Sequence, residues 1–208
     1  MKKILCFGDS NTWGHNPVDC SQLEKPWPVA MRGMLKDCEI ISDGVCGRAA
    51  RNRVKAGDGT DGIDVFREKY LAGENDFDLI IIMLGTNDVL NSNNFTPDEI
   101  AETLSMYVKE CRGKFGAERP KILLVSPILI RDYCMKHSIF SELYSEASII
   151  KSRCLAEKIS EVARREGVYF MDAAKAAAAS PIDGVHMDEK EHKKLATAIA
   201  AKVNLIFS

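Results

Sequence analysis

Short apolar runs alternate along the chain with longer segments in which apolar residues recur every three or four positions. Each run is rich in Ile, Leu or Val and closes at a polar or turn-forming residue, which is typical of β-strands. The third and fourth runs are nearly continuous apolar stretches, as expected for parallel strands covered on both faces. The predicted strands are Lys3–Phe7, Glu39–Ser42, Leu79–Leu84, Lys121–Val125 and Val168–Met171.

Helix signals fill the intervals between these strands. Thr96-Pro97-Asp98-Glu99 combines an N-cap, a proline at the first helical position and a capping-box glutamate. An apolar stripe from Ile100 to Phe115 follows and predicts a core-facing helix. Two further helices are predicted, over Glu142–Glu166 and over Glu189–Leu205.

Strand–helix alternation of this kind predicts an α/β fold built on a five-stranded doubly wound parallel sheet. Residues 1–208 show no internal repeat and no linker, which predicts a single domain. The glycine-rich segment Ala56–Gly62 is expected to be a surface loop. In such sheets, ligands bind beyond the carboxyl ends of the strands, so the residues after each strand carry the functional information.

The balance of charged and hydrophobic residues indicates which kinds of main binding partner the sequence does not favour. Hydrophobic residues make up 46% and charged residues 28% of the chain, and the net charge is −2. This balance favours neither nucleic acid nor an anionic membrane as a partner. No apolar run is long enough to span a bilayer, and the first run stops at Gly8-Asp9, too early for a signal peptide. The seven cysteines form no C-x-x-C pair, which favours reduced thiols and a cytoplasmic location.

Polar clusters follow four of the predicted elements and are expected to meet at one edge of the sheet. They are Gly8–Gly14 after the first strand, Asp43–Arg48 after the second, Gly85–Asp88 after the third, and Asp183–His186 ahead of the last helix. Each alone has an ordinary interpretation as a turn, an Asx turn or a capping residue. Their conjunction supplies what acyl transfer requires.

Ser10, His186 and Asp183 have the chemistry of a nucleophile, its base and the group that orients the base. A serine hydroxyl needs a neighbouring base to become nucleophilic, and histidine titrates close to neutral pH. Asp183 stands three residues before His186, where it could accept the Nδ1 hydrogen and leave Nε2 facing Ser10. The backbone N–H groups of Ser10 and Gly47 and the side-chain amide of Asn87 are the candidate oxyanion donors.

These motifs resemble the SGNH (GDSL) hydrolase family over almost the whole chain. The matching blocks are Gly8-Asp9-Ser10, Gly44 to Arg48, Gly85-x-Asn87-Asp88 and Asp183-x-x-His186, and longer stretches resemble the bacterial arylesterase and acyltransferase branch. The resemblance implies a three-layer flavodoxin-like fold and a shallow active site without metal or cofactor. It also implies an oxyanion hole made by Ser10, Gly47 and Asn87.

The chain departs from that branch at Asn11, where a small apolar or hydroxyl residue is more usual, and at Ala49 and Ala50, where two threonines are more usual. Asn11, Trp13 and Arg48 are the candidate substrate-binding residues. For Arg48 a structural ion pair is the competing role. Relatives in this branch are often oligomers, and Pro17–Pro26 is a candidate contact segment for a homo-oligomer, with an ordinary surface loop as the alternative.

The leading hypothesis is a serine esterase that hydrolyses small acyl esters, or transfers their acyl group, through an acyl-Ser10 intermediate. A carbohydrate O-acetylesterase of the same fold is the close alternative. A non-catalytic flavodoxin-like binding domain is a third hypothesis, opposed by the intact Asp183 and His186 pair. His15, His137 and His192 lack the spacing of a zinc site.

Overall fold

A five-stranded sheet forms the centre of the protein in a computed structural model that describes residues 1–54 and 59–208. Its strands run in the order β2-β1-β3-β4-β5, and every neighbouring pair is parallel. This confirms the predicted five-stranded parallel sheet. The strands are β1 (Lys2–Gly8), β2 (Cys38–Gly44), β3 (Leu79–Met83), β4 (Lys121–Ser126) and β5 (Tyr169–Asp172).

Helices and helical turns connect the strands. The α-helices are α1 (Ser10–Trp13), α2 (Trp27–Arg32), α3 (Gly62–Phe66), α4 (Pro97–Phe115), α5 (Phe140–Leu143), α6 (Glu146–Arg165) and α7 (Glu189–Phe207). A π-helical turn, η1 (Arg67–Leu71), extends α3, and two 3₁₀ turns, η2 (Asp132–Lys136) and η3 (Ala173–Lys175), follow β4 and β5. Within the described part of the chain, none of these helices is both long and apolar enough to cross a membrane.

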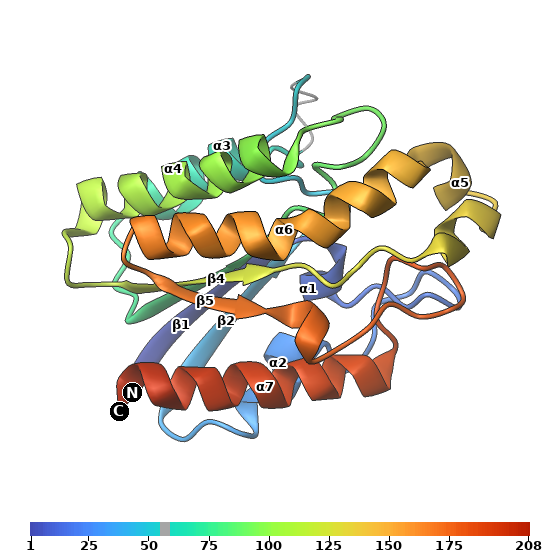
Figure 1. Cartoon of the computed structure of the whole chain (residues 1–208). Coiled ribbons are helices and arrows are strands. Elements are labelled where there is room, and N and C mark those ends of the chain that lie inside the picture. The colour runs from blue at the N-terminus through green and yellow to red at the C-terminus, as the bar shows by residue number, and fades with distance from the viewer. Residues whose placement is uncertain (55–58) are drawn as a thin grey trace.

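Two helical layers cover the two faces of the sheet (Figure 1), with α3, α4 and α6 on one face and α2 and α7 on the other. Side chains alternate between the faces along each strand. In β1, Leu5 and Phe7 pack with the first layer, whereas Ile4 and Cys6 pack with the second. The sheet is therefore buried on both sides, which explains the nearly continuous apolar strands in the sequence.

The strand order reverses between β1 and β3. The chain passes from β1 to β2 on one side and then crosses to β3 on the other side of β1. In doubly wound sheets the binding crevice lies beyond the strand ends at this switch point. Ser10 directly follows β1 and Asn87 follows β3, so the topology brings both to the crevice.

The structure differs from the predicted elements in three places. The helix expected over 142–166 is two helices, α5 and α6, because Ser145 is extended and caps α6 through a capping box with Ser148. Short helices α1, α2 and α3 were not predicted, since each is too brief to show a helical period. In the expected loop 56–62, residues 56–58 lie outside the described residues, and Gly62 begins α3.

Gly44 brings the end of β2 against the backbone of α1, which carries Ser10. A Cβ atom at Gly44 would lie 2.1 Å from the backbone nitrogen of Trp13 and 2.5 Å from the carbonyl carbon of Thr12. Neither backbone atom can move without moving the helix. α1 can therefore place Ser10 at the end of β1 only because residue 44 has no side chain.

Replacing this glycine should displace the helix that carries Ser10. We expect Gly44→Ala to lower the free energy of unfolding by about 1–3 kcal/mol, as overpacking does in a close-packed interior, when measured by urea denaturation. Gly113→Ala in α4 is the matched control, since a Cβ there meets nothing within 4 Å and alanine favours a helix. Equal stability of the Gly44 variant and wild type would show that α1 does not depend on this contact.

Candidate active site

The turn that carries Ser10 is held by the aspartate before it. Asp9 caps α1, and its Oδ1 accepts a hydrogen bond from the backbone N–H of Asn11 at 2.9 Å. The helix lasts one turn and ends at Gly14, which adopts a left-handed conformation with φ of 95°. Ser10 is thus the first residue of a short helix that begins at the carboxyl end of the central strand β1.

A second tight loop, just before α7, presents His186. Oδ1 of Asp183 accepts hydrogen bonds from the backbone N–H groups of Val185 and His186, both at 2.9 Å. Gly184 within this loop has φ of 72°, and a Cβ there would lie 2.6 Å from the backbone nitrogen of Cys134. The loop is therefore fixed both by its own aspartate and by close packing against η2.

Ser10, His186 and Asp183 form a continuous hydrogen-bonded chain. Nε2 of His186 lies 2.8 Å from Oγ of Ser10, and Nδ1 of His186 lies 2.7 Å from Oδ2 of Asp183. All three side chains are buried. Burial alone would raise the pKa of Asp183, but the hydrogen bonds from His186 and the loop N–H groups outweigh it and hold that pKa below its usual value. Asp183 is therefore a carboxylate facing the imidazole.

Hydrogen-bond donors lie beside Ser10. Gly47 has φ of 81°, a left-handed conformation that favours glycine, and it lines the same pocket as Ser10. The backbone N–H groups of Ser10 and Gly47 have no acceptor among the described residues. Nδ2 of Asn87 donates one hydrogen bond to the carbonyl of Arg48 at 2.9 Å, which fixes the amide and leaves its second hydrogen available to the pocket.

Asn11 connects the two loops and does not line the pocket. Its Nδ2 donates to the carbonyl of Val185 at 3.2 Å, and its Oδ1 accepts from the N–H of Met187 at 3.1 Å. The side chain is 2% exposed, so both ends of the amide are committed within the protein. In place of the expected substrate contact, Asn11 braces the backbone on both sides of His186.

Arg48 and Trp13 also lie elsewhere than the substrate-binding hypothesis placed them. The guanidinium of Arg48 is buried, pairs with Asp43 at 3.0 Å and donates to the carbonyl of Gly8. This is the competing structural role, and it ties the ends of β1 and β2 together. Trp13 is half-buried and does not line the pocket, although its ring lies 6.3 Å from that of His15.

The departures at Ala49 and Ala50 lie behind the pocket. Both residues are fully buried. The N–H of Ala50 donates to Asp88 at 2.9 Å, and its carbonyl accepts from the hydroxyl of Tyr107 at 2.9 Å. Ala49 and Ala50 therefore connect the Gly47 loop to α3 and α4 without facing the pocket.

A cavity of about 190 Å³ opens at Ser10 and is lined by both polar and apolar residues. Most of its wall has no signal in the sequence. His15 lacks the spacing of a zinc site and has no other local signal. Leu143 and Tyr144 fall inside the helix predicted over Glu142–Glu166, and Phe140 lies just before it, so no sequence signal sets these residues apart. The residues not predicted to line this pocket are His15, Cys46, Leu90, Phe140, Leu143 and Tyr144.

The ring of His15 packs on that of His186, with centroids 4.0 Å apart and planes inclined by 34°. Phe140 packs on His186 as well, at 5.4 Å. Burial, and then the neighbouring His186, lower the pKa of His15 to about 4. His15 is thus an uncharged aromatic neighbour of the imidazole at neutral pH.

His15, Asp183 and His186 also form a cluster whose donor atoms all lie within 4.8 Å of one another. However, Nδ1 of His186 is engaged by Asp183 and Nε2 by Ser10. A metal ligand needs a free ring nitrogen, and His186 could provide one only by breaking one of these hydrogen bonds. The donor set therefore fits a hydrogen-bonded triad better than a metal site.

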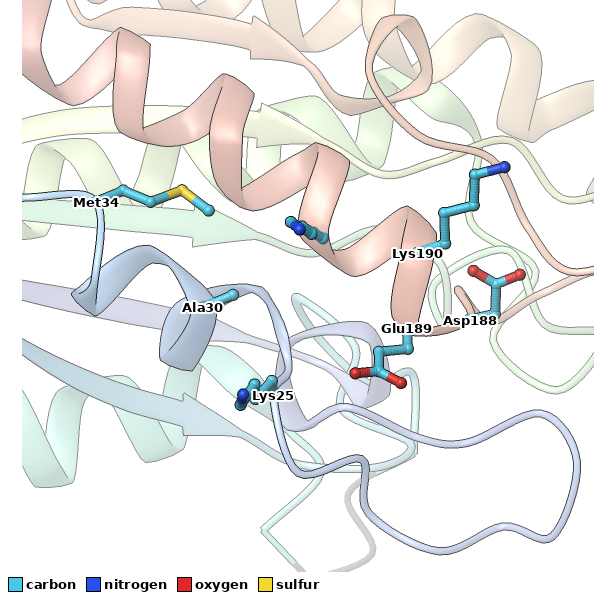
Figure 2. Close-up of a pocket in the computed structure, with 7 residues that line it drawn as sticks. Lys25, Ala30, Met34, Asp188, Glu189 and Lys190 are labelled. Atoms are coloured by element: carbon cyan, nitrogen blue, oxygen red, sulfur yellow. The ribbon is translucent and has the colours of Figure 1, made fainter.

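A larger groove of about 630 Å³ lies between α2 and the start of α7 (Figure 2). Its wall combines three lysines and two acidic residues with an apolar floor. None of the lining residues is a serine, cysteine or histidine, so the groove lacks a nucleophile and a base despite its size. The residues are Lys25, Ala30, Met34, Asp188, Glu189, Lys190 and Lys193.

Two further carboxyl groups are buried beneath the site. Burial raises the pKa of Asp9 to about 6 and that of Asp88 to about 7. Backbone N–H groups oppose this effect, those of Ala50 and Arg51 at Asp88 and that of Asn11 at Asp9. Asp88 thereby ties the Gly47 loop to the end of β3.

Comparison with known proteins agrees with this geometry. A model of the GDSL-like lipase/acylhydrolase family matches residues 4–199, and the chain belongs to that family. None of the curated proteins compared with the chain matches it in sequence.

Solved structures support the same assignment. Est24, a carbohydrate acetylesterase from Sinorhizobium meliloti, is 31% identical with a TM-score of 0.87, covering 99% of this chain and 100% of its own. A carbohydrate acetylesterase family member from the same organism is 26% identical with a TM-score of 0.88, covering 99% and 98%. The native M. smegmatis aryl esterase is 31% identical with a TM-score of 0.86, covering 98% and 99%. The fold is that of the SGNH hydrolases, and the protein is a serine esterase.

Removing the brace at Asn11 should loosen the loop that holds His186. Asn11→Ala leaves a buried carbonyl and a buried N–H without partners, and we expect it to lower the unfolding free energy by about 2–4 kcal/mol. We also expect kcat for ester hydrolysis to fall about tenfold or more, because small displacements of catalytic groups are costly. Asn204→Ala on the exposed face of α7 is the control. Unchanged kcat in the Asn11 variant would show that His186 is held without the brace.

Asp88 should make stability depend on pH. The folded protein keeps this proton up to about pH 7, whereas an unfolded chain releases it near pH 4. The folded state therefore binds more protons over that window, and the contribution of Asp88 to stability falls as pH rises. We expect Asp88→Asn to gain stability relative to wild type between pH 5 and pH 8, by on the order of 1 kcal/mol or more.

Urea unfolding at pH 5 and pH 8 measures this gain. The variant also alters hydrogen bonds to the Gly47 loop, but that effect is common to both pH values and cancels in the difference. Asp76→Asn, at a carboxylate that is 90% exposed, is the control and should show no such gain. The same difference between Asp88→Asn and wild type at both pH values would contradict a buried, protonated Asp88.

Proposed function

We propose that the protein hydrolyses small carboxylic esters through an acyl-Ser10 intermediate. The observation that carries the proposal is the hydrogen-bonded chain from Ser10 Oγ through His186 to Asp183, with contacts of 2.8 and 2.7 Å. Those lengths allow direct proton transfer from the hydroxyl to Nε2. The modest cavity of about 190 Å³ supports a small acyl group.

In the first half of the reaction, Oγ of Ser10 attacks the ester carbonyl while Nε2 of His186 accepts the hydroxyl proton. The negative charge that forms on the carbonyl oxygen is stabilised by the N–H groups of Ser10 and Gly47 and by Nδ2 of Asn87. The tetrahedral intermediate then collapses, and His186 donates its proton to the departing alcohol. Asp183 holds Nδ1–H throughout and stabilises the imidazolium.

In the second half, water takes the place of the alcohol. His186 accepts a proton from the water, the hydroxide attacks the acyl carbon, and the proton returns to Oγ of Ser10 as the acid leaves. An alcohol in place of water would accept the acyl group instead, which is the transferase reaction.

We propose further that the enzyme works in the cytoplasm. All seven cysteines are free in the structure, which supports a reducing compartment. Assembly into a homo-oligomer through residues 17–26 stays a prediction.

Substitutions of the nucleophile and of the oxyanion donor test the proposal. We expect Ser10→Ala to lower kcat/KM for p-nitrophenyl acetate by on the order of 10⁴-fold or more. Asn87→Ala should lower kcat by about 10²–10³-fold, because it removes a donor used mainly in the transition state. Ser160→Ala on α6 is the control and should retain wild-type activity. Substantial activity in Ser10→Ala would rule out the acyl-Ser10 mechanism.

A further inference from the structure

The imidazole of His186 has two hydrogen bonds before the reaction, and acylation removes one of them. Nδ1 is bonded to Asp183 at 2.7 Å, and Nε2 is bonded to Oγ of Ser10 at 2.8 Å. Once Oγ carries an acyl group, it has no hydrogen to donate to the lone pair of Nε2. Of the two bonds, the acyl-enzyme then keeps the one to Asp183. A ring held at one nitrogen can swing about that contact, so another contact must hold His186 while water reacts.

Two aromatic rings pack on His186, and neither contact depends on the hydroxyl of Ser10. The ring of His15 has its centroid 4.0 Å from that of His186, with the planes inclined by 34°. The ring of Phe140 is farther away, at 5.4 Å, and more steeply inclined, at 57°. Aromatic rings in contact attract one another. His15 is therefore the closer and more nearly parallel of the two neighbours.

A short hairpin presents His15 to the imidazole. The chain turns back after His15, which pairs with Gln22 in an isolated antiparallel bridge, and the N–H of Asn16 donates to the carbonyl of Ser21 at 2.8 Å. The side-chain amide of Gln22 donates to the carbonyl of Trp13 at 2.8 Å. The hairpin is therefore closed on itself and also tied to α1, the helix that carries the nucleophile.

The backbone of His15 is also bonded directly to the nucleophilic residue. Its N–H donates to the carbonyl of Ser10 at 3.0 Å, and the N–H of Leu23 donates to the carbonyl of Gly14 at 2.7 Å. These are backbone contacts, so acylation of the Ser10 side chain does not break them. The position of the His15 ring is therefore fixed relative to Ser10 in the free enzyme and in the acyl-enzyme alike.

The charge of His15 suits a ring that packs on the catalytic base. Burial and the neighbouring His186 lower the pKa of His15 to about 4, although Asp183 and Asp19 act in the opposite direction. The ring is therefore uncharged near neutral pH. His186 becomes an imidazolium in each half of the reaction, and a cationic neighbour so close would repel it. An uncharged ring provides packing without that repulsion.

We propose that His15 is a positioning residue that holds the imidazole of His186 in place after Ser10 has been acylated. Its ring keeps Nε2 aligned with the water that attacks the acyl carbon. In that step Nε2 accepts a proton from water, and the hydroxide oxygen bonds to the acyl carbon. The bond from that carbon to Oγ then breaks as Nε2 returns the proton to Oγ. The inference rests on the proposed esterase function and adds a residue to its second half.

Removing the ring should slow the second half of the reaction more than the first. The substrate is p-nitrophenyl acetate, whose p-nitrophenolate leaves readily, so that hydrolysis of the acyl-enzyme limits the rate. We expect His15→Ala to lower kcat about tenfold, because small displacements of a catalytic group are costly. KM should fall by a similar factor as acyl-enzyme accumulates. The ratio kcat/KM, which reports acylation, should change less than about threefold. Stopped-flow absorbance of the p-nitrophenolate burst measures the two steps separately.

Two further variants separate packing from other effects of the substitution. His15→Phe keeps an aromatic ring and removes the ring nitrogens, so we expect kcat within about threefold of wild type. Val18→Ala, at an exposed side chain on the same hairpin, is the matched control for a change in that segment and should behave as wild type. Thermal unfolding of each variant shows whether the fold is retained.

The results distinguish the positioning role from the proposed function. A parallel fall of kcat and KM in His15→Ala, absent in His15→Phe, supports the positioning role. Three results overturn it: an unchanged kcat in the alanine variant, a fall in kcat/KM as large as the fall in kcat, or a phenylalanine variant as slow as the alanine variant. A wild-type enzyme that cleaves no ester overturns the proposed function itself.

Discussion

The contact between Ser10 and His186 depends on bringing together two residues that are 176 positions apart in the chain. The parallel sheet provides the meeting point, because the carboxyl ends of its strands share one edge and β1 lies at the point where the strand order reverses. The positions of Ser10 and His186 are fixed by side chains of neighbouring residues. Asp9 fixes the turn at Ser10, Asp183 fixes the loop at His186, and the amide of Asn11 joins the two.

The site buries several carboxyl groups. Removing them from water costs free energy, and the hydrogen bonds around them largely offset that cost. Asp183 remains ionised because three donors face it, whereas Asp9 and Asp88 have pKa values raised by burial. The carboxylate that faces the imidazole therefore loses its proton at a lower pH than the carboxyl groups that hold loops. Such divergence between neighbouring carboxyl groups is how one site separates catalytic from structural roles.

The strands, the long helices and the strand-end clusters could be predicted from the sequence because each has a local signal. Periodicity marks the strands, and the topology of parallel sheets carries Ser10, Gly47, Asn87 and His186 to one edge. The pocket wall had no such signal. Tyr144 is the C-cap of α5 and Ser145 is the N-cap of α6, so Tyr144 lies between two helices and not inside the single helix that the sequence predicted. Asn11 and Arg48 are close to Ser10 and Gly47 in sequence, but their side chains turn into the protein.

The wall of the pocket also contains Cys46, a second group with nucleophilic chemistry beside Ser10. Burial raises the pKa of that thiol, which disfavours the reactive thiolate. Rapid quenching during turnover of p-nitrophenyl acetate, followed by mass spectrometry of the digested protein, shows directly which side chain carries the acyl group. Our account predicts a transient acetyl group on Ser10. An acetyl group on Cys46, or turnover without any acylated serine, would contradict it.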